Sequence, residues 1–192
     1  MRVIAGIYRS RILKSLKGPA LRPTSDRLRE TLFNVLGDAV DGARFLDVFA
    51  GTGAVGIEAI SRGAAEVVFI ENHAPAAVLI RRNLESLGIR SGTAVLAVDA
   101  LRGLEKLAVR SDPAKPGFHF IFVDPPYAAA DEYEQVLYHL GSSPLLELGT
   151  KVIVEHRQKF ELPEAVGRLT RTRILQQGDA SLSFFSVRRP SA

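Results

Sequence analysis

Residues 44–56, RFLDVFAGTGAVG, decide the fold of this chain. Residues 44–50 form an apolar run typical of a buried strand, and glycines 51, 53 and 56 follow it directly. Glycines let the backbone turn sharply and approach a ligand closely. Residues 53–62 then predict a helix that ends at residues 62–63. A strand, a glycine turn and a helix in this order predict an α/β sheet with a ligand at the carboxyl ends of its strands.

The alternation of strand and helix continues from this stretch to the end of the chain. Apolar runs predict strands over 66–71, 93–99, 118–124 and 151–156, helices over 75–87, 100–109 and 131–140, and a closing antiparallel pair over 169–176 and 182–188. Strands that alternate with helices form parallel sheets covered on both faces. We therefore expect a Rossmann-like, doubly wound α/β fold, with a mostly parallel seven-stranded sheet and an antiparallel C-terminal strand pair.

The N-terminal residues carry most of the positive charge. A short hairpin is predicted around residues 8–10, and Thr24 or Ser25 can cap a following helix. Residues 1–30 contain eight basic and two acidic groups, a net +6, whereas the remaining residues carry 17 basic and 19 acidic groups, a net −2. We expect a basic extension over residues 1–42, one domain over residues 43–192, and a polyanionic partner.

The composition excludes several classes of protein. The 192 residues include no cysteine, which excludes disulfides, thiolate metal sites and cysteine nucleophiles. The four histidines are scattered without ligand spacing, so no metal is expected. No apolar run approaches the ~18 residues of a membrane span. The N-terminal stretch has charges within its apolar residues and does not resemble a signal peptide. We therefore expect a cytoplasmic protein, with a monomer as the default.

Two acidic residues beside the glycine turn indicate the kind of cofactor. The carboxylate of Asp47 would repel a pyrophosphate but suits a ligand that carries an ammonium group. Glu71 ends the second strand and can accept hydrogen bonds from ribose hydroxyls. S-adenosylmethionine has an ammonium group and a ribose and has no phosphate, so these acids favour it. Asp99 closes the third strand and can accept from the adenine amine, although an acid there also commonly caps a helix.

The motif DPPY, residues 124–127, is the most specific feature of the chain. Proline restricts the residue before it to extended geometry, so Asp124 and Pro125 are held stiffly. A carboxylate beside a fixed carbonyl offers two acceptors to an exocyclic amine, and Tyr127 can stack on the base. The two acceptors return electron density to a nitrogen whose lone pair is delocalised into the ring, so that it can attack a methyl group in line. The motif predicts amine methylation, with Asp124, Pro125, Pro126 and Tyr127 as catalytic residues.

Four stretches of the chain together resemble one known family. RVIAGIYRSRIL, LRPTSDRLRETLFNVL, LDVFAGTGAVGIEAISRGA and FVDPPY are similar to the bacterial RsmD family of class I S-adenosylmethionine-dependent methyltransferases. That family methylates guanine N2 in 16S ribosomal RNA of the small subunit. The resemblance is close over residues 2–127 and looser beyond them. It implies the same reaction on 16S rRNA, within a small ribosomal subunit or an assembly intermediate, with S-adenosylhomocysteine as the product.

The resemblance also implies roles for individual residues. The cofactor-binding set is Asp47, Ala50, Gly51, Gly53, Gly56, Glu71, Asn72, Asp99 and Ala100, with Thr24 and Asn34 helping to close the pocket. The set expected to meet RNA is Arg2, Arg9, Arg11, Lys14, Arg22, Arg27 and Arg29. For the arginines, ion pairs within the fold are the alternative. Members of the family often carry phenylalanine at the position of Tyr127, and both side chains can stack on a base.

Three other functions stay open on the sequence. An adenine-N6 nucleic-acid methyltransferase uses the same chemistry, although 192 residues leave no room for a separate target-recognition domain. GTGAVG also fits the dinucleotide fingerprint of a nicotinamide-dependent oxidoreductase, which leaves Asp47 and the DPPY motif unexplained. The third is a non-catalytic ribosome-binding factor on a methyltransferase scaffold, against which the intact DPPY motif argues.

Overall fold

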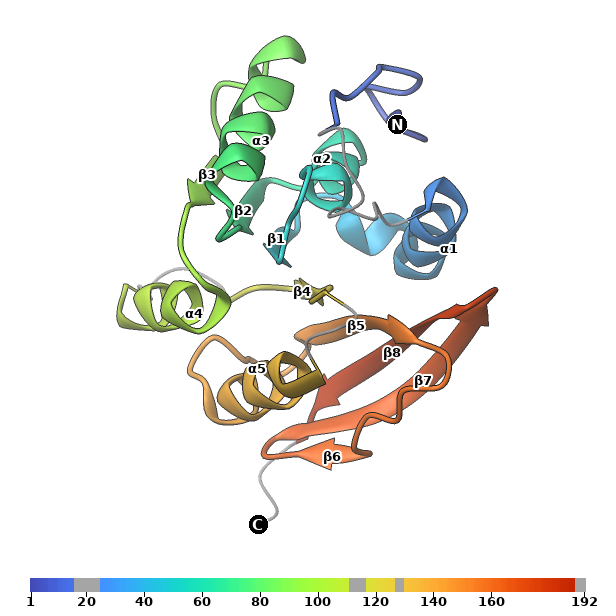
Figure 1. Cartoon of the computed structure of the whole chain (residues 1–192), viewed down its shortest axis with the longest axis vertical. Helices are drawn as coiled ribbons and strands as arrows, with labels where there is room; N and C mark the ends of the chain where they lie inside the picture. Colours follow the sequence, from blue (N-terminus) through green and yellow to red (C-terminus); the bar gives the residue numbers. More distant parts are fainter. Residues whose placement is uncertain (16–24, 111–116, 127–129, 189–192) are drawn as a thin grey trace. The chain divides into compact units, whose positions relative to one another are not determined.

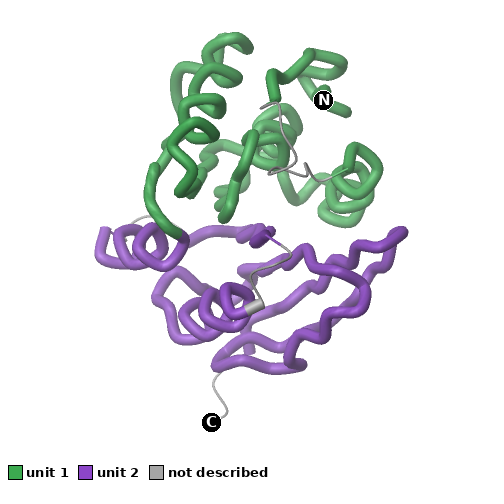
Figure 2. The backbone as a smooth tube through the Cα atoms, in the orientation of Figure 1, with its two compact units in different colours: residues 1–99 green, residues 100–192 purple. Residues whose placement is uncertain are grey.

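A computed structural model describes residues 1–15, 25–110, 117–126 and 130–188 (Figure 1). The chain divides into two compact units, residues 1–99 and residues 100–192 (Figure 2). Residues 1–42 belong to the first unit together with its three strands. The division of the chain into an extension over residues 1–42 and a domain over residues 43–192 therefore stays a prediction.

The first unit contains a parallel three-stranded sheet in the order β3-β2-β1. Its strands are β1 (Arg44–Val48), β2 (Glu66–Ile70) and β3 (Thr93–Leu96), and its helices α2 (Ala54–Ser61) and α3 (Ala74–Ser86) follow β1 and β2. All but the first residue of β1 and of β2 are buried. Continuous burial of this kind occurs where both faces of a parallel sheet are covered, which explains why these strands are apolar runs rather than alternating patterns.

Helix α1 (Asp26–Leu36) begins at Ser25, whose side-chain oxygen accepts the backbone N–H of Leu28 at 3.1 Å. This contact confirms Ser25 as a cap, whereas Thr24 lies outside the described residues. The apolar face of α1 is buried as its spacing predicts, and the ring of Phe33 stacks on Phe45 of β1 with centroids 6.1 Å apart. A short 3₁₀ helix (Gly37–Val40) then leads into β1.

The N-terminal arm, residues 1–15, turns back on itself as predicted but does not form a hairpin of two strands. One isolated antiparallel bridge joins Arg2 and Ile12. The backbone N–H groups of Ile4 and Ala5 donate instead to the carboxylate of Glu58 in α2, at 2.8 and 3.0 Å. A two-stranded ladder cannot extend here because a distant side chain takes these donors.

The second unit contains five strands in the order β4-β5-β8-β7-β6. Its elements are α4 (Ala100–Val109), β4 (Phe120–Val123), α5 (Ala130–Ser142), β5 (Lys151–Arg157), β6 (Ala165–Val166), β7 (Leu169–Gln177) and β8 (Ala180–Val187). β4 and β5 are parallel, and the remaining neighbours are antiparallel. The prediction of seven strands is corrected to eight in the described residues. The additional strand, β6, has two residues and is too short to give a periodic signal.

The predicted α/β class is confirmed, with parallel strands in each unit and an antiparallel pair, β7 and β8, at the C-terminal end of the chain. No helix in the described part of the chain has the length and apolar character needed to cross a membrane.

Candidate cofactor and acceptor sites

The glycine turn after β1 has a backbone that other residues rarely adopt. Gly51 and Gly53 have φ values of 56° and 77°, and Gly53 is the N-cap of α2. Phe49, a non-glycine residue, also has a positive φ of 63°. Strained backbone of this kind concentrates at ligand sites, because the surrounding structure must hold it in place. The sequence analysis missed the conformation of Phe49, since a phenylalanine gives no local signal for a left-handed backbone.

Asp47 lies in the interior at the carboxyl end of β1, with 2% of its surface exposed. Its Oδ2 accepts the backbone N–H of Gly56 in the first turn of α2 at 2.9 Å. Burial raises the pKa of Asp47 to about 7. The Gly56 hydrogen bond opposes this rise, and the nearby charge of Glu71 adds to it. A carboxylate held near its titration point is suited to a cationic ligand, because the ligand's charge favours the ionised form.

Gly56 has a packing role in addition to its place in the glycine turn. A Cβ atom at this position would lie 2.2 Å from the ring of Phe69 in β2. Only glycine therefore lets α2 approach the sheet this closely. Its N–H is engaged by Asp47. Gly56 thus packs the helix on the sheet and positions Asp47, and its place in the predicted cofactor set stays a prediction.

Glu71 is fixed by the backbone on both of its carboxylate oxygens. Oε2 accepts the N–H of Gly51 at 2.6 Å, and Oε1 accepts the N–H of His73 at 2.7 Å. The structure thus brings together two members of the predicted cofactor set that are 20 residues apart in the chain. Each carboxylate oxygen can accept more than one hydrogen bond, so Glu71 retains capacity for hydroxyl groups of a ligand.

The remaining predicted cofactor residues differ in exposure. The backbone N–H of Ala50 donates to the carbonyl of Ile70 at the end of β2, which holds the turn against that strand. Asn72 and Asp99 are exposed and follow β2 and β3, whose last residues are register partners. Ala100 is the buried first residue of α4. Asn34 is exposed on α1, and the structure does not show it closing a pocket.

The acceptor motif follows β4 in the second unit. Asp124 is half-buried, Pro125 is buried and Pro126 is exposed. Tyr127 lies outside the described residues. The hydroxyl of Tyr133 in α5 donates to the carbonyl oxygen of Pro125 at 3.3 Å. That carbonyl is the second acceptor of the predicted amine site, so its orientation depends on a side chain eight residues further along the chain.

Tyr133 is itself held by a cluster of aromatic side chains. Its ring packs on Phe160 with centroids 4.8 Å apart, and Phe160 meets the edge of His156 at 6.4 Å. Nε2 of His156 lies 2.8 Å from the hydroxyl of Ser183 in β8. Burial lowers the pKa of His156, so this residue is a neutral structural group at pH 7. The sequence does not single out Tyr133, because its spacing in α5 looks like that of any apolar helix residue.

The predicted RNA-contacting residues fall into three groups. Exposed side chains belong to Arg2, Arg9, Arg11, Lys14 and Arg27. Arg22 lies outside the described residues. Arg29 is fully buried, with 0% of its surface exposed, so its assignment to RNA phosphate is wrong. Arg29 instead forms an ion pair within the fold, which was the alternative for these arginines.

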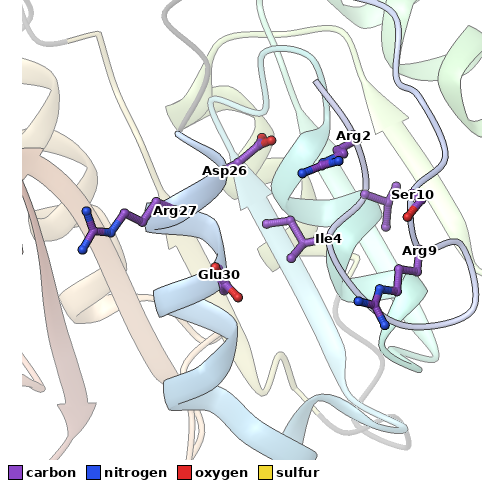
Figure 3. A pocket seen from close by; sticks show the side chains of 8 residues that line it. Arg2, Ile4, Arg9, Ser10, Asp26, Arg27 and Glu30 are labelled. Carbon is purple, nitrogen blue, oxygen red and sulfur yellow. The ribbon is translucent and has the colours of Figure 1, made fainter.

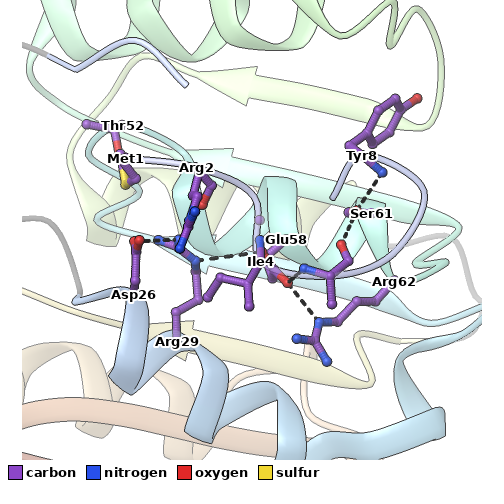
Figure 4. A network of polar contacts seen from close by, with 12 residues as sticks. Met1, Arg2, Ile4, Tyr8, Asp26, Arg29, Thr52, Glu58, Ser61 and Arg62 are labelled. Atoms are coloured by element: carbon purple, nitrogen blue, oxygen red, sulfur yellow. Dashed lines mark hydrogen bonds and ion pairs between the residues drawn. The ribbon is translucent and has the colours of Figure 1, made fainter. Parts of the chain in front are cut away.

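Arg29 belongs to a buried polar network that attaches the N-terminal arm to the first unit (Figure 4). Its Nη2 donates to the carbonyl of Arg2 at 2.7 Å and to Asp26 at 2.9 Å. Its Nε lies 3.8 Å from Oε2 of Glu58. Glu58 also accepts from Nε of Arg62 at 2.9 Å, besides the two N–H groups of the arm. The arm is thus held through its backbone, which leaves its basic side chains exposed.

Two further contacts hold the arm. The N–H of Ile7 donates to the carbonyl of Ser61 at 2.8 Å, and a Cβ on Gly6 would lie 1.7 Å from that oxygen. Asn83 of α3 accepts the N–H of Lys14 and donates to its carbonyl. The same amide of Asn83 donates to the carbonyl of Thr52 in the glycine turn at 3.2 Å. One buried side chain therefore contacts both the arm and the turn.

Comparison with known proteins agrees with these features. The model of the family described as Conserved hypothetical protein 95 matches residues 1–186. "Putative rRNA methyltransferase YlbH" of Bacillus subtilis is 37% identical over 188 residues, which cover 98% of this chain and 100% of that protein. "Ribosomal RNA small subunit methyltransferase D" of Haemophilus influenzae is 39% identical over 128 residues, 66% of this chain and 64% of that protein.

Solved structures show the same fold. "Putative methyltransferase yhhF from Escherichia coli" superposes with a TM-score of 0.82 at 29% identity, over 98% of both chains. The structure of SMU.776 complexed with SAH has a TM-score of 0.67 at 13% identity, over 84% of this chain and 48% of that chain. With a family model that covers nearly the whole sequence, these matches confirm the resemblance: this chain has the α/β methyltransferase fold and belongs to the RsmD family.

Proposed function

We propose that this chain transfers a methyl group from S-adenosylmethionine to the exocyclic N2 amine of a guanine in 16S ribosomal RNA, as a cytoplasmic monomer acting on a small ribosomal subunit or an assembly intermediate. The observation that carries the chemistry is the pair of acceptors after β4, the Asp124 carboxylate and the Pro125 carbonyl held by Tyr133. The relatives named as ribosomal RNA methyltransferases support RNA as the acceptor.

The first unit supplies groups that suit the parts of the cofactor. S-adenosylmethionine, when bound, supplies a methyl group on a positively charged sulfur. Asp47 would hold its ammonium group, Glu71 its ribose hydroxyls and Asp99 its adenine amine. The buried, backbone-bonded carboxylates of Asp47 and Glu71 fit this set of donors. They do not fit the pyrophosphate of a dinucleotide, which two buried acids would repel. The oxidoreductase alternative is disfavoured for that reason.

The second unit supplies the groups that activate the amine. The Asp124 carboxylate and the Pro125 carbonyl accept the two amine hydrogens and keep the nitrogen lone pair out of the ring. As the nitrogen bonds the methyl carbon, the bond from that carbon to sulfur breaks and S-adenosylhomocysteine is left. The nitrogen becomes positive, the Asp124 charge stabilises it, and one amine proton is then lost, for which the Asp124 carboxylate can be the acceptor. Preorganised charges directed at the position where charge develops contribute strongly to catalysis. Guanine N2 and adenine N6 both have two hydrogens, so this chemistry serves either base.

The exposed basic side chains of the arm and of α1 are proposed to bind phosphate. Such contacts release counterions, so binding falls steeply as the salt concentration rises. A base that is stacked or paired must also leave the stack to reach the two acceptors. RNA affinity that is insensitive to salt would contradict this role for the arm.

The direct test is methyl transfer from labelled S-adenosylmethionine to small ribosomal subunits from cells that lack the enzyme. The RNA is then digested and its nucleosides are identified. We expect labelled N2-methylguanosine. Labelled N6-methyladenosine would support the proposed mechanism but would identify adenine, and not guanine, as the acceptor base. Absence of transfer to subunits and to free RNA, in a protein that binds S-adenosylhomocysteine, would refute the proposed reaction.

Cofactor affinity is expected to depend on pH through Asp47. Its pKa of about 7 means that the ammonium group of the ligand meets an ionised partner only as the pH rises through 7. The affinity for S-adenosylhomocysteine should therefore rise about tenfold between pH 6 and pH 8, as the ionised fraction rises. Calorimetric titration measures this slope. Asp47→Asn should remove it, and a slope retained in that variant would contradict the assignment.

The same pKa predicts how the stability of the unliganded protein changes with pH. A folded-state pKa of about 7, above the ordinary value of 3.8, means that between these pH values the native state holds a proton that the unfolded state has released. The stability that this bound proton contributes to the folded state is fully present below pH 3.8 and is lost as the pH rises through 7. The free energy of unfolding of wild type, relative to Asp47→Asn, should fall across this window in denaturant titrations.

Tyr133→Phe is expected to lower kcat about fivefold and to leave the KM for S-adenosylmethionine unchanged. The loss of one hydrogen bond of about 1 kcal/mol frees the Pro125 carbonyl to reorient, while the ring and its packing on Phe160 remain. Tyr138→Phe is the matched control, because Tyr138 lies on the same helix and is 77% exposed. Equal kcat values for the two variants would show that Tyr133 does not position the acceptor.

A further inference from the structure

The N-terminal arm and the first turns of α1 enclose a hollow of about 410 Å³ (Figure 3). Its lining includes Arg2, Ile4 and Arg9 from the arm and Asp26, Arg27 and Glu30 from α1. Asp26 is already engaged by the buried Arg29. Within the described parts of the chain, the side chains of Arg2, Arg9, Arg27 and Glu30 make no hydrogen bond or ion pair. The hollow therefore combines the cations of Arg2 and Arg9 with the available carboxylate of Glu30, whereas the side chain of Arg27 extends from α1 away from the arm (Figure 3).

The placement of these groups matches the parts of a nucleotide. Figure 3 shows Glu30 on the side of α1 that faces the arm, with Ile4 and Arg9 across from it. Ile4 is half-buried and offers an apolar surface to the face of a base. A carboxylate accepts hydrogen bonds and does not donate them, so Glu30 favours a base edge that donates. Arg2 and Arg9 on the arm offer cations to phosphate.

We propose that this hollow is a second nucleotide-binding site, which holds a single-stranded residue of the RNA acceptor whose base carries an exocyclic amine. The proposal rests on the proposed function in one respect, that the acceptor is RNA. Cytosine, adenine and guanine have such an amine to donate to Glu30. Uracil has only its N3–H, and the two carbonyl oxygens that flank this donor repel a carboxylate. None of the described residues that line the hollow belongs to the DPPY motif, and the proposed role of the hollow is to recognise the substrate and not to take part in transfer.

The walls of the hollow are formed before any ligand arrives. Glu58 binds the backbone of Ile4 and Ala5, and Arg29 binds the carbonyl of Arg2. On the other wall, α1 begins at the Ser25 cap directly beside Asp26 and Arg27. A site that is already ordered binds its ligand without a cost for ordering loops. This property distinguishes the hollow from a set of exposed arginines that only attract phosphate.

The test measures fluorescence anisotropy of labelled hexamers of cytidine (rC6) and uridine (rU6) with the full-length protein. We expect wild type to bind rC6 about five- to tenfold more tightly than rU6, the discrimination given by one charged acceptor on the amine. Glu30→Gln should bring this ratio close to one, because an amide can also donate to the carbonyl of uracil. Arg9→Gln should weaken both hexamers equally and reduce the salt dependence of binding.

The matched controls come from a second hollow of about 470 Å³ that includes Glu85 and Arg90. Glu85→Gln and Arg90→Gln change the same charges elsewhere in the first unit and should leave both the ratio and the affinities unchanged. Thermal unfolding checks that each variant is folded. Equal binding of rC6 and rU6 by wild type would overturn the proposal. The proposal would also be overturned if Glu30→Gln kept the wild-type preference for rC6 over rU6. The same holds if Glu85→Gln reduced that preference as much as Glu30→Gln does.

The hexamer experiment is independent of catalysis, because it needs no cofactor and the hexamers contain no guanine. A protein that discriminates rC6 from rU6 but transfers no methyl group to subunits refutes only the proposed function. A protein that methylates guanine N2 in subunits but binds the two hexamers equally refutes only the second nucleotide site.

Discussion

Asp124→Ala is expected to lower methyl transfer to small ribosomal subunits by about 10²–10³-fold, the loss typical when a preorganised polar group is removed from a site of developing charge. The carboxylate both accepts an amine hydrogen and stabilises the positive nitrogen, so its removal lowers kcat rather than cofactor affinity. Affinity for S-adenosylhomocysteine should stay within about twofold of wild type, since the cofactor residues of the first unit are untouched. Single-turnover transfer of labelled methyl groups measures the rate.

Asp124→Asn separates the two roles of the carboxylate. The amide oxygen still accepts one hydrogen bond but lacks the charge, and charge-assisted hydrogen bonds are about twice as strong as neutral ones. We expect this variant to lose about tenfold in rate. Asp131→Ala, an exposed acid in the first turn of α5, is the control and should leave the rate unchanged. A wild-type rate in Asp124→Ala would remove this residue from the mechanism and would favour the non-catalytic ribosome-binding alternative.

Glu58→Ala is expected to lower the free energy of unfolding by about 3–5 kcal/mol, the usual cost of removing one partner of a buried charge pair. Glu58 is completely buried and accepts from Ile4, Ala5 and Arg62. Its loss leaves the guanidinium of Arg29 in the interior, where Nε and Nη1 have no hydrogen-bond acceptor within the described residues. The arm should detach as well, because two of its backbone donors lose their partner.

Denaturant unfolding measures this loss, and Glu66→Ala is the matched control. Glu66 bonds Arg44 at 3.0 Å, but its side chain is 37% exposed, so its removal should cost about 1 kcal/mol or less. Proteolysis of the arm in the folded protein gives a second readout and should accelerate only in Glu58→Ala. Equal losses of stability in the two variants would show that the buried network does not hold the arm.

Much of the fold and of the candidate site could be predicted from local sequence. The helices and strands of both units lie close to their predicted bounds, because apolar periodicity and glycine or proline breaks act over a few residues. The glycine turn and the motif after β4 could also be predicted from local sequence, because the functional residues of each are close together in the chain. Glu71 was found because it ends a strand, and the end of a parallel strand has a fixed place at the sheet edge.

The incorrect predictions concern residues whose surroundings are set by contacts between distant parts of the chain. Arg29 has the same local surroundings as the exposed Arg27, and only the packing of α1 against α2 and the arm places it in the interior beside Glu58. The close approach of Gly56 to the ring of Phe69 is likewise visible only in the folded structure, and it adds a packing role to this predicted cofactor residue. The predicted hairpin became a single bridge because a glutamate 54 residues away takes the N–H of Ile4.

The class of fold, the order of its elements and the two motifs that identify the family can be predicted from residues adjacent in the chain. Three other features appear only after folding: which polar groups are buried, the contact of Tyr133 with the Pro125 carbonyl, and the hollow that the arm and α1 form beside Glu30. The two sets of features differ in the range of the interactions that produce them. Backbone preference and apolar spacing act locally, whereas burial, hydrogen bonding of side chains and the raised pKa of Asp47 depend on neighbours that folding brings together.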